Sequence, residues 1–267
     1  MKSLIPLFLL SAAPLLAEAL PQLGGQAPWL GQYAGTENRD FRFIVKTDGQ
    51  GQLMPAKEKG GFVTDNFAIR FVSLIEETLP DGKVVSKMVK EDAWEAVTPA
   101  AKDPKKVTYR GTVAGDAKFE VNFELEKGAI RAGGKILDKG QLSNPRFVMR
   151  IQVPFVYLYE KDAEKLKEKV KNDRMEVVRT DGKKLKLEMD KPLDAETAEY
   201  SGPGITQARI EIAYYGGHKL DVATTPGAAF ELWNKEEKAL IEGFTLGWKH
   251  DAAKDPEGKA RLTFQLK

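Results

Sequence analysis

Residues 119–125 read Phe-Glu-Val-Asn-Phe-Glu-Leu, with an apolar side chain at every second position. Successive side chains of a strand point to opposite faces of a sheet. The spacing therefore predicts a strand with one face in a core and the other in water. Antiparallel sheets commonly have one solvated face, whereas parallel sheets are buried on both faces. This stretch therefore indicates an antiparallel sheet.

The same alternation recurs along the chain, at residues 41–46, 67–72, 107–113 and 147–153. Asp-Gly turns separate alternating runs at residues 47–49, 80–82 and 180–182. Asp-Gly supplies the positive φ that tight hairpin turns need. Together these patterns predict an all-β fold with an antiparallel β-sandwich architecture.

The first residues have the pattern of an export signal. Lys2 precedes an apolar run that ends at Leu16, and Ala17-Glu18-Ala19 follows as a small-x-small motif. The run is shorter than the roughly 20 residues that a membrane-spanning helix needs. This order predicts a signal peptide over residues 1–19, cleaved after Ala19, and no transmembrane anchor in the mature chain.

The 267-residue sequence contains no cysteine and no Asn-x-Ser/Thr acceptor. An exported chain without disulfides must be stabilised by burial of its core alone. Both absences favour export in a bacterium, to the periplasm or the cell exterior, over a eukaryotic secretory route.

The mature chain divides at one charged segment. Residues 161–172 place Ala163, Leu166 and Val170 at helical spacing among lysines and acids, which predicts a short solvated helix. Residues 20–38 are rich in Gly, Pro and Gln and predict a loop-like N-terminal arm. The expected organisation is a first β-sandwich unit over 39–159, a linker helix over 160–173 and a second unit over 174–267.

Five features occur in the same order on both sides of that helix, at nearly constant offsets. They include the alternating runs 107–113 and 244–250, followed by 119–123 and 262–266. This order predicts an internal duplication, that is, two tandem related units. The alternative is one large two-sheet sandwich that covers the whole mature chain.

Composition and motifs exclude several classes of function. The sequence has 41 Lys+Arg, 39 Asp+Glu and a formal net charge of +2, which is too small to indicate nucleic-acid binding. Two histidines and no cysteine exclude a site of three imidazoles or of thiolates. The sequence contains no Gly-x-Ser-x-Gly, Ser-x-x-Lys or His-Glu-x-x-His motif, and no cofactor is expected.

Four residues are candidates for catalysis. Glu95 and Glu231 each follow an aromatic residue, at matching places of the two units. A glycosidase needs two carboxylates about 5–10 Å apart, and this pair is the best candidate for one. His218 and His250 are the side chains that titrate nearest to neutral pH. No flanking motif marks any of the four, so a structural role is the favoured alternative.

Other residues are candidates for binding. Asp190, Asp194, Glu196 and Glu199 crowd one loop, where they form either a calcium site or, as the favoured alternative, a solvated acidic loop. Tyr215 and Trp233 are the candidate sugar-stacking aromatics. Adjacent strand residues face opposite ways, so one of Tyr214 and Tyr215 is expected in the core and Tyr215 on the surface. Trp233 precedes a possible short helix over residues 235–242.

Three hypotheses of function remain. The favoured one is an exported, non-catalytic β-sandwich protein that binds a glycan or another envelope protein. The second is a polysaccharide-acting enzyme that uses paired carboxylates from both units. The third is a structural envelope protein whose sheet edges join an assembly. The ligand and the oligomeric state stay open.

Overall fold

The computed structural model of the chain describes residues 19–157, 159–188, 204–233 and 243–267. Their regular structure is nearly all strand, and helix α1 (Ala163–Val170) and the 3-10 turns η1 (Asp65–Phe67) and η3 (Ala213–Tyr215) lie between strands. A short contact between β1 and β7 is parallel, and the other strand pairings in these ranges are antiparallel. The predicted all-β, antiparallel sandwich is confirmed.

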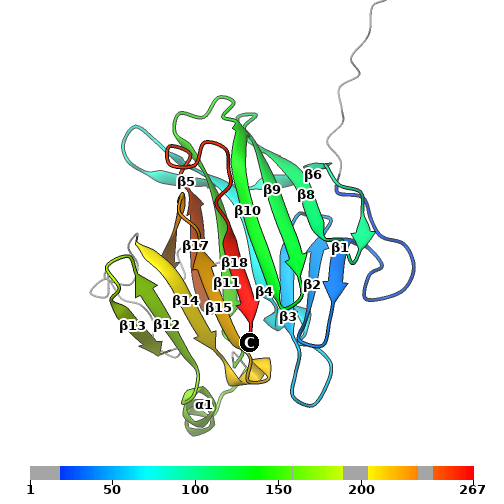
Figure 1. The fold of residues 1–267 in the computed structure, drawn as a ribbon, viewed down its shortest axis with the longest axis vertical. Coiled ribbons are helices and arrows are strands. Elements are labelled where there is room, and N and C mark those ends of the chain that lie inside the picture. The colour runs from blue at the N-terminus through cyan, green and yellow to red at the C-terminus, as the bar shows by residue number, and fades with distance from the viewer. Residues whose placement is uncertain (1–18, 158, 189–203, 234–242) are drawn as a thin grey trace, which may run out of the picture.

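The strands lie in two layers (Figure 1). In spatial order the first layer contains β1 (Gln32–Glu37), β2 (Phe41–Lys46), β3 (Gly51–Pro55), β4 (Ile69–Thr78), β11 (Pro145–Pro154), β17 (Gly243–His250) and β16 (Ala228–Trp233). The second contains β6 (Val89–Ala96), β8 (Lys106–Val113), β9 (Lys118–Glu126), β10 (Ala129–Asp138), β18 (Leu262–Leu266), β15 (Lys219–Thr224), β14 (Ile205–Glu211), β12 (Arg174–Arg179) and β13 (Lys184–Glu188).

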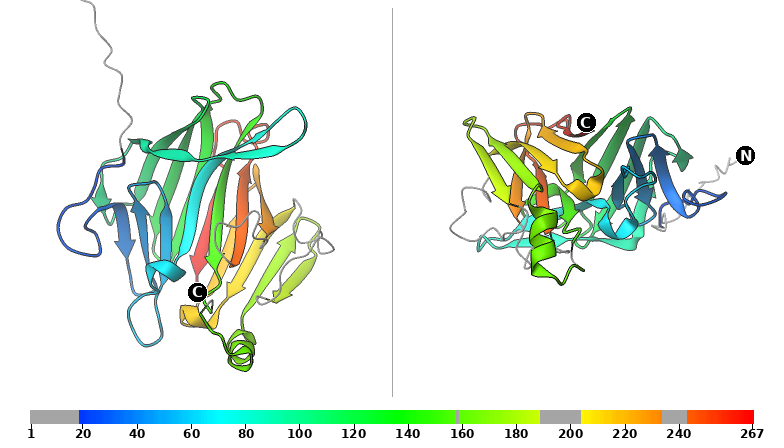
Figure 2. Two further views of the ribbon diagram at one scale, coloured as in Figure 1. Left: turned by 180° about the vertical axis from the view of Figure 1, so that it is seen from behind. Right: turned by 90° about the horizontal axis from the view of Figure 1, so that it is seen from below.

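Short contacts complete the edges of the layers. Strand β5 (Val84–Lys87) pairs with β4 beyond the end of β3, and β7 (Ala101–Lys102) pairs with β1. A bridge between Ile205 and Phe230 joins β14 to β16, so the two layers are continuous at this edge. Strand β1 and the pair β12–β13 lie at opposite sides of the molecule (Figures 1 and 2).

The predicted Asp-Gly hairpins are present. Gly49, Gly82 and Gly182 have φ values of 73°, 83° and 80° and connect β2 to β3, β4 to β5 and β12 to β13. Glycine at position 49 has a second cause. A Cβ there would lie 2.5 Å from the ring of Trp94, so the turn and the packing of this indole both require glycine.

The alternating residues fill the space between the layers. Phe119, Val121 and Phe123 are fully buried, as their spacing predicts. Phe71, from the first layer, packs edge-on against Phe123 at 6.0 Å and Phe264 at 5.7 Å between ring centroids. Residues from the beginning and the end of the chain therefore share one core.

The predicted division into two separate units is wrong. Strand β11 pairs with β4 on one edge and with β17 on the other, and β10 pairs with both β9 and β18. Each layer thus combines strands from residues 39–159 and 174–267. The alternative, one large two-sheet sandwich, describes the fold. Hairpin patterns reveal local partners only, so the distant partners of β10 and β11 were missed.

The strands matched by the duplication do not occupy equivalent places. β8 and β9 form an antiparallel pair in the second layer. Their expected counterparts differ, because β17 pairs with β11 and β16 in the first layer, whereas β18 pairs with β10 and β15 in the second. The expected superposition of 107–123 on 244–266 is therefore not seen.

The helix and the arm can also be compared with the prediction. Helix α1 lies within the expected range, and the Asp162 side chain caps it by accepting from the backbone N–H groups of Glu164 and Lys165. The arm over 20–38 is only partly loop. Its residues 32–37 form the edge strand β1, because Tyr33 is fully buried and β1 pairs with β2.

The outer face of the first layer differs from expectation. Alternation places Val148, Arg150 and Gln152 of β11 in water, yet all three are buried. Glu76 on β4 is buried on the same face and forms an ion pair with Arg150. The centre of this layer is therefore covered on both faces, and its outer face combines apolar side chains such as Val148 with charged and amide groups.

A shared core makes a prediction about cooperativity. We expect Phe123→Ala and Phe264→Ala each to reduce the free energy of unfolding by about 3–5 kcal/mol, the usual cost of emptying a buried aromatic site. Both variants should unfold in one transition, measured by denaturant titration with fluorescence and far-ultraviolet circular dichroism.

Leu137→Ala is the matched control, since this side chain is 42% exposed. Its effect should stay within about 0.5 kcal/mol. Two separate transitions, or a loss below about 1 kcal/mol at either phenylalanine, would contradict the shared core.

Candidate functional site

The first-layer edge carries a cleft with a volume of about 680 Å³. It lies at the end of β17, beside the turn between β15 and β16. Two of the candidate catalytic residues, Glu231 and His250, line it. The other lining residues are Arg146, Thr180, Thr206, Thr224, Thr225, Pro226, Gly227, Ala228, Ala229, Phe230, Lys249, Asp251 and Lys254.

Close packing of two loops forms one wall of this cleft. Gly227, in the turn between β15 and β16, has a φ of 95°, and a Cβ there would lie 2.6 Å from the Cβ of Asp255. The backbone N–H of Asp251 donates to the Gly227 carbonyl at 2.9 Å. Glycine at this position lets the loop after β17 lie directly on the turn.

His250 anchors that loop rather than standing free for acid–base chemistry. Its Nε2 lies 3.0 Å from the Asp255 carbonyl oxygen and 3.1 Å from Asp255 Oδ2. Both partners are acceptors, so Nε2 donates to them. The imidazole is buried and stacks against Trp248 with the ring centroids 6.3 Å apart.

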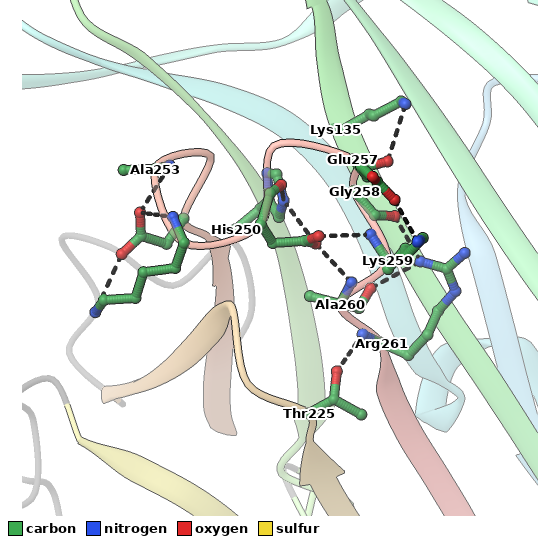
Figure 3. A network of polar contacts seen from close by, with 12 residues as sticks. Lys135, Thr225, His250, Ala253, Glu257, Gly258, Lys259, Ala260 and Arg261 are labelled. Atoms are coloured by element: carbon green, nitrogen blue, oxygen red, sulfur yellow. Dashed lines mark hydrogen bonds and ion pairs between the residues drawn. The ribbon is translucent and has the colours of Figure 1, made fainter.

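Asp255 joins His250 to Lys259 and Ala260, three residues that Figure 3 labels in the network of polar contacts. Its carboxylate also accepts from the backbone N–H groups of Lys259, at 2.9 Å, and Ala260, at 2.6 Å. Burial acts to raise the pKa of this carboxyl, but the hydrogen bonds from Ala260, Lys259 and His250 outweigh burial and hold the pKa below its usual range. The charged form of Asp255 therefore stabilises the loop.

The carboxylate candidates Glu95 and Glu231 do not meet. Glu231 lies on β16 in the first layer, where it forms an ion pair with Lys249, and Lys249 in turn contacts Glu76 at 3.0 Å. Glu95 lies on β6 in the second layer and contacts Arg110 at 3.4 Å. The described interactions place each carboxylate beside its own cation, in different layers.

The histidines also lie apart. His218 precedes β15, and the cleft lies at the other end of this strand, beyond Thr224. A strand of this length spans about 20 Å, so His218 and His250 do not form one site.

The prediction for Tyr215 is wrong. Residues 213–215 form the 3-10 turn η3, so the alternation of a strand does not apply there. Tyr215 is fully buried and its hydroxyl donates to the Phe67 carbonyl oxygen at 3.2 Å. Tyr214 is the partly buried residue of the pair, and Lys57 lies over its ring.

Several candidates lie outside the described residues. The side chain of Trp233 is one, although its backbone ends β16. The possible helix over 235–242 and the acidic residues Asp190, Asp194, Glu196 and Glu199 are others. Within the described ranges, no group of three or more His, Cys, Asp or Glu side chains is arranged to hold a metal ion.

Arg146 is a functional candidate that sequence reasoning missed. It lies on β11, is exposed at the rim of the cleft and has no partner among the described residues. Four threonines in the lining add hydroxyl groups. Thr206 donates to the Val178 carbonyl oxygen, and Thr224 accepts from Trp248 Nε1 at 2.8 Å. No local motif marks Arg146 among the 41 basic residues of the sequence.

Comparison with known proteins shows only distant likenesses. No family model and no curated protein sequence matches the chain. A solved structure of a GalM/aldose epimerase homologue from C. elegans is similar, with 10% identity, a TM-score of 0.46 and coverage of 87% of this chain and 97% of that one. The Slr1438 protein from Synechocystis sp. PCC 6803 has 12% identity, a TM-score of 0.41 and coverage of 86% and 96%.

A third solved structure, HI1317, has 9% identity, a TM-score of 0.36 and coverage of 86% of this chain and 97% of that one. Such similarity leaves the function to be argued from the residues of this chain. The fold and the cleft define a two-layer β-sandwich with a polar site at one edge.

A search of the described helices finds none that is long and apolar enough to cross a membrane.

The Asp255 network makes a prediction about stability. We expect Asp255→Ala to reduce the free energy of unfolding by about 2–4 kcal/mol near neutral pH, because charge-assisted hydrogen bonds to two backbone N–H groups and His250 are lost. A group with a lowered folded-state pKa stabilises above its ordinary pKa and loses this effect as the pH falls. The difference from wild type should therefore shrink below about pH 4.

Asp251→Ala is the control in the same loop. Asp251 is more exposed, and all its partners lie in its own turn: the backbone N–H groups of Ala253 and Lys254 and the exposed ammonium of Lys254. Its loss should cost about 1 kcal/mol or less. Equal effects of the two variants in urea titrations would show that Asp255 has no special role.

Proposed function

We propose that the protein is an exported, non-catalytic β-sandwich protein that binds a carbohydrate in the cleft at the end of β17. The observation that carries this proposal is the lining of the cleft. It combines threonine hydroxyls, small apolar residues and Arg146, which has no partner within the described ranges, on a frame of paired strands.

This lining is complementary to a sugar. Sugar hydroxyls both donate and accept hydrogen bonds, as threonine hydroxyls do, and arginine donates to ring or hydroxyl oxygens. Pro226, Ala228 and Ala229 offer apolar contact for the C–H faces of a sugar ring. The volume of about 680 Å³ lies within the range of small-molecule sites.

The charges of the cleft support binding over catalysis. Glu231 and Asp251 each have a lysine partner, Lys249 and Lys254 respectively. His250 uses Nε2 to hold Asp255. A glycosidase needs two carboxylates facing the same bond, whereas the two carboxylates of the lining, Glu231 and Asp251, are each held by a lysine. Enzymatic action on polysaccharide and structural assembly remain the competing hypotheses.

Binding can be tested with an array of neutral and acidic oligosaccharides, followed by calorimetry on the tightest ligand. We expect Arg146→Ala to weaken binding about tenfold, the effect of one charge-assisted hydrogen bond. Arg146 has no described partner, so the variant should fold as the wild type does.

Arg131→Ala is the matched control, because Arg131 is a half-exposed arginine on β10 that pairs with Glu126. It should leave affinity unchanged. Release of reducing sugar from the ligand would support the enzyme hypothesis instead. A blank array together with defined oligomers in native mass spectrometry would support the assembly hypothesis.

Export has its own test. Leu20, the first residue after the expected cleavage site, is buried, and its backbone nitrogen donates to the Thr47 carbonyl oxygen at 3.1 Å. Cleavage after Ala19 retains this anchor. Intact-mass analysis of protein secreted by a bacterial host should therefore show Leu20 as the new N-terminus. An uncleaved chain that stays in the cytoplasm would contradict the proposal.

A further inference from the structure

A row of polar side chains crosses the outer face of the first layer. Gln52 on β3 lies directly opposite Arg70 on β4, Arg70 opposite Gln152 on β11, and Gln152 opposite Thr245 on β17. Directly opposed residues of neighbouring strands point to the same face. With strands about 4.8 Å apart, these four residues, called the polar row below, span about 14 Å.

Each member of the polar row has a buried polar atom without a hydrogen-bond partner in the part of the chain that the structure describes. These atoms are Gln52 Oε1, Arg70 Nε, Gln152 Nε2 and Thr245 Oγ1. Gln52, Gln152 and Thr245 are at most 1% exposed, whereas Arg70 is only partly buried. Buried polar groups in folded proteins are nearly always satisfied. A run of such atoms across adjacent strands therefore points to a missing partner.

The charge of Arg70 narrows the chemistry of that partner. Two other cations on the same face are neutralised, since Glu76 forms ion pairs with both Arg150 and Lys249. Arg70 has no acidic partner among the described residues. A half-buried guanidinium without a counter-ion is a favourable place for a planar anion such as a carboxylate.

The flanking glutamines extend this complementarity. Gln152 offers an N–H donor on one side of Arg70, and Gln52 offers a carbonyl acceptor on the other. The second amide atom of Gln52 already donates to Gln50 Oε1 at 3.1 Å, which fixes Oε1 as the free end. A carboxylate would accept from Arg70 and Gln152, and a neighbouring hydroxyl would donate to Gln52.

An apolar cluster borders the same subsite. Met54, two residues beyond Gln52 on the same face of β3, packs with Ile44 and Ala68, and Trp29 and Phe62 cover them. A ligand at Arg70 would therefore meet charge and hydrogen-bonding groups on one side and apolar surface on the other. Sugars with a carboxylate combine both features.

We propose that Arg70, with Gln52 and Gln152, forms a subsite that binds the carboxylate of an acidic sugar. This inference rests on the proposed carbohydrate function and assigns it a substrate class. Arg70 lies six residues, about 20 Å, from Arg146 along the β4–β11 pairing, so this subsite lies outside the cleft itself. Arg70 is the partly exposed member, so the carboxylate approaches the polar row there, and Thr245 lies two strands away.

The test uses D-glucuronate and D-glucose, which differ at the carboxylate, in calorimetric titrations of the full mature chain. We expect glucuronate to bind wild type at least tenfold more tightly than glucose. Arg70→Ala should abolish this preference and leave the affinity for glucose unchanged. Arg70→Lys should retain part of it, because it keeps the charge without the planar fork.

Gln152→Met separates binding from folding. It removes an unpartnered buried amide, so the melting temperature should stay equal or rise, while glucuronate binding weakens. Thr245→Val is the matched control in the same row. It should likewise not lower the melting temperature, and it should leave glucuronate binding unchanged.

The outcomes distinguish the two proposals. If neutral oligosaccharides bind but glucuronate is no better than glucose, the subsite is wrong and the carbohydrate function stands. If Arg70→Ala binds glucuronate as wild type does, the subsite is also wrong. If no sugar binds wild type on the array or in titration, both proposals fail.

Discussion

The double pairing of strand β11 is the constraint on which the rest of the molecule depends. Its backbone bonds to β4 along one edge and to β17 along the other, in continuous registers. A strand held on both sides cannot shift by one residue without turning every side chain to the opposite face. The aromatic core, the charged outer face and the position of the cleft therefore follow from one register.

The same register concentrates charge on a buried face, where unpaired charges are destabilising. Glu76 neutralises two of these charges, because its carboxylate contacts both Arg150 and Lys249. Lys249 also contacts Glu231. Arg146 and Arg70 lie on the same face, six residues apart along the β4–β11 pairing, without such partners among the described residues. The paired side chains Glu76, Arg150 and Lys249 stabilise the layer, whereas Arg146 and Arg70 are the ones that the two proposals assign to a ligand.

Much of the fold could be predicted from sequence, because alternation and Asp-Gly turns are local signals. Phe119 and Phe123 face the core as predicted, and the hairpin at Gly49 is present. Partners far apart in the chain leave no such signal, so the union of both halves through β11 was missed. Alternation also does not tell whether the second face of a strand is covered, and Gln152 was therefore expected in water.

The candidate site was harder to predict for a related physical reason. Tyr215 was misplaced because a 3-10 turn replaces the strand that its neighbours suggest. Glu231 and His250 do reach the cleft, but their partners Lys249 and Asp255 are fixed by tertiary contacts and decide what each can do. Arg70 and Arg146 stand out because neither has a counter-ion among the described residues, and no sequence pattern reports such a tertiary feature.

Rigidity is what makes the unpartnered atoms of the polar row informative. In a loop, a side chain such as Gln152 would turn toward water or a neighbour and satisfy its amide. In the middle of a layer whose strands are bonded on both edges, the backbone cannot move to relieve it. A rigid site loses little conformational entropy when a ligand binds. More of the interaction free energy with the ligand therefore appears as binding affinity.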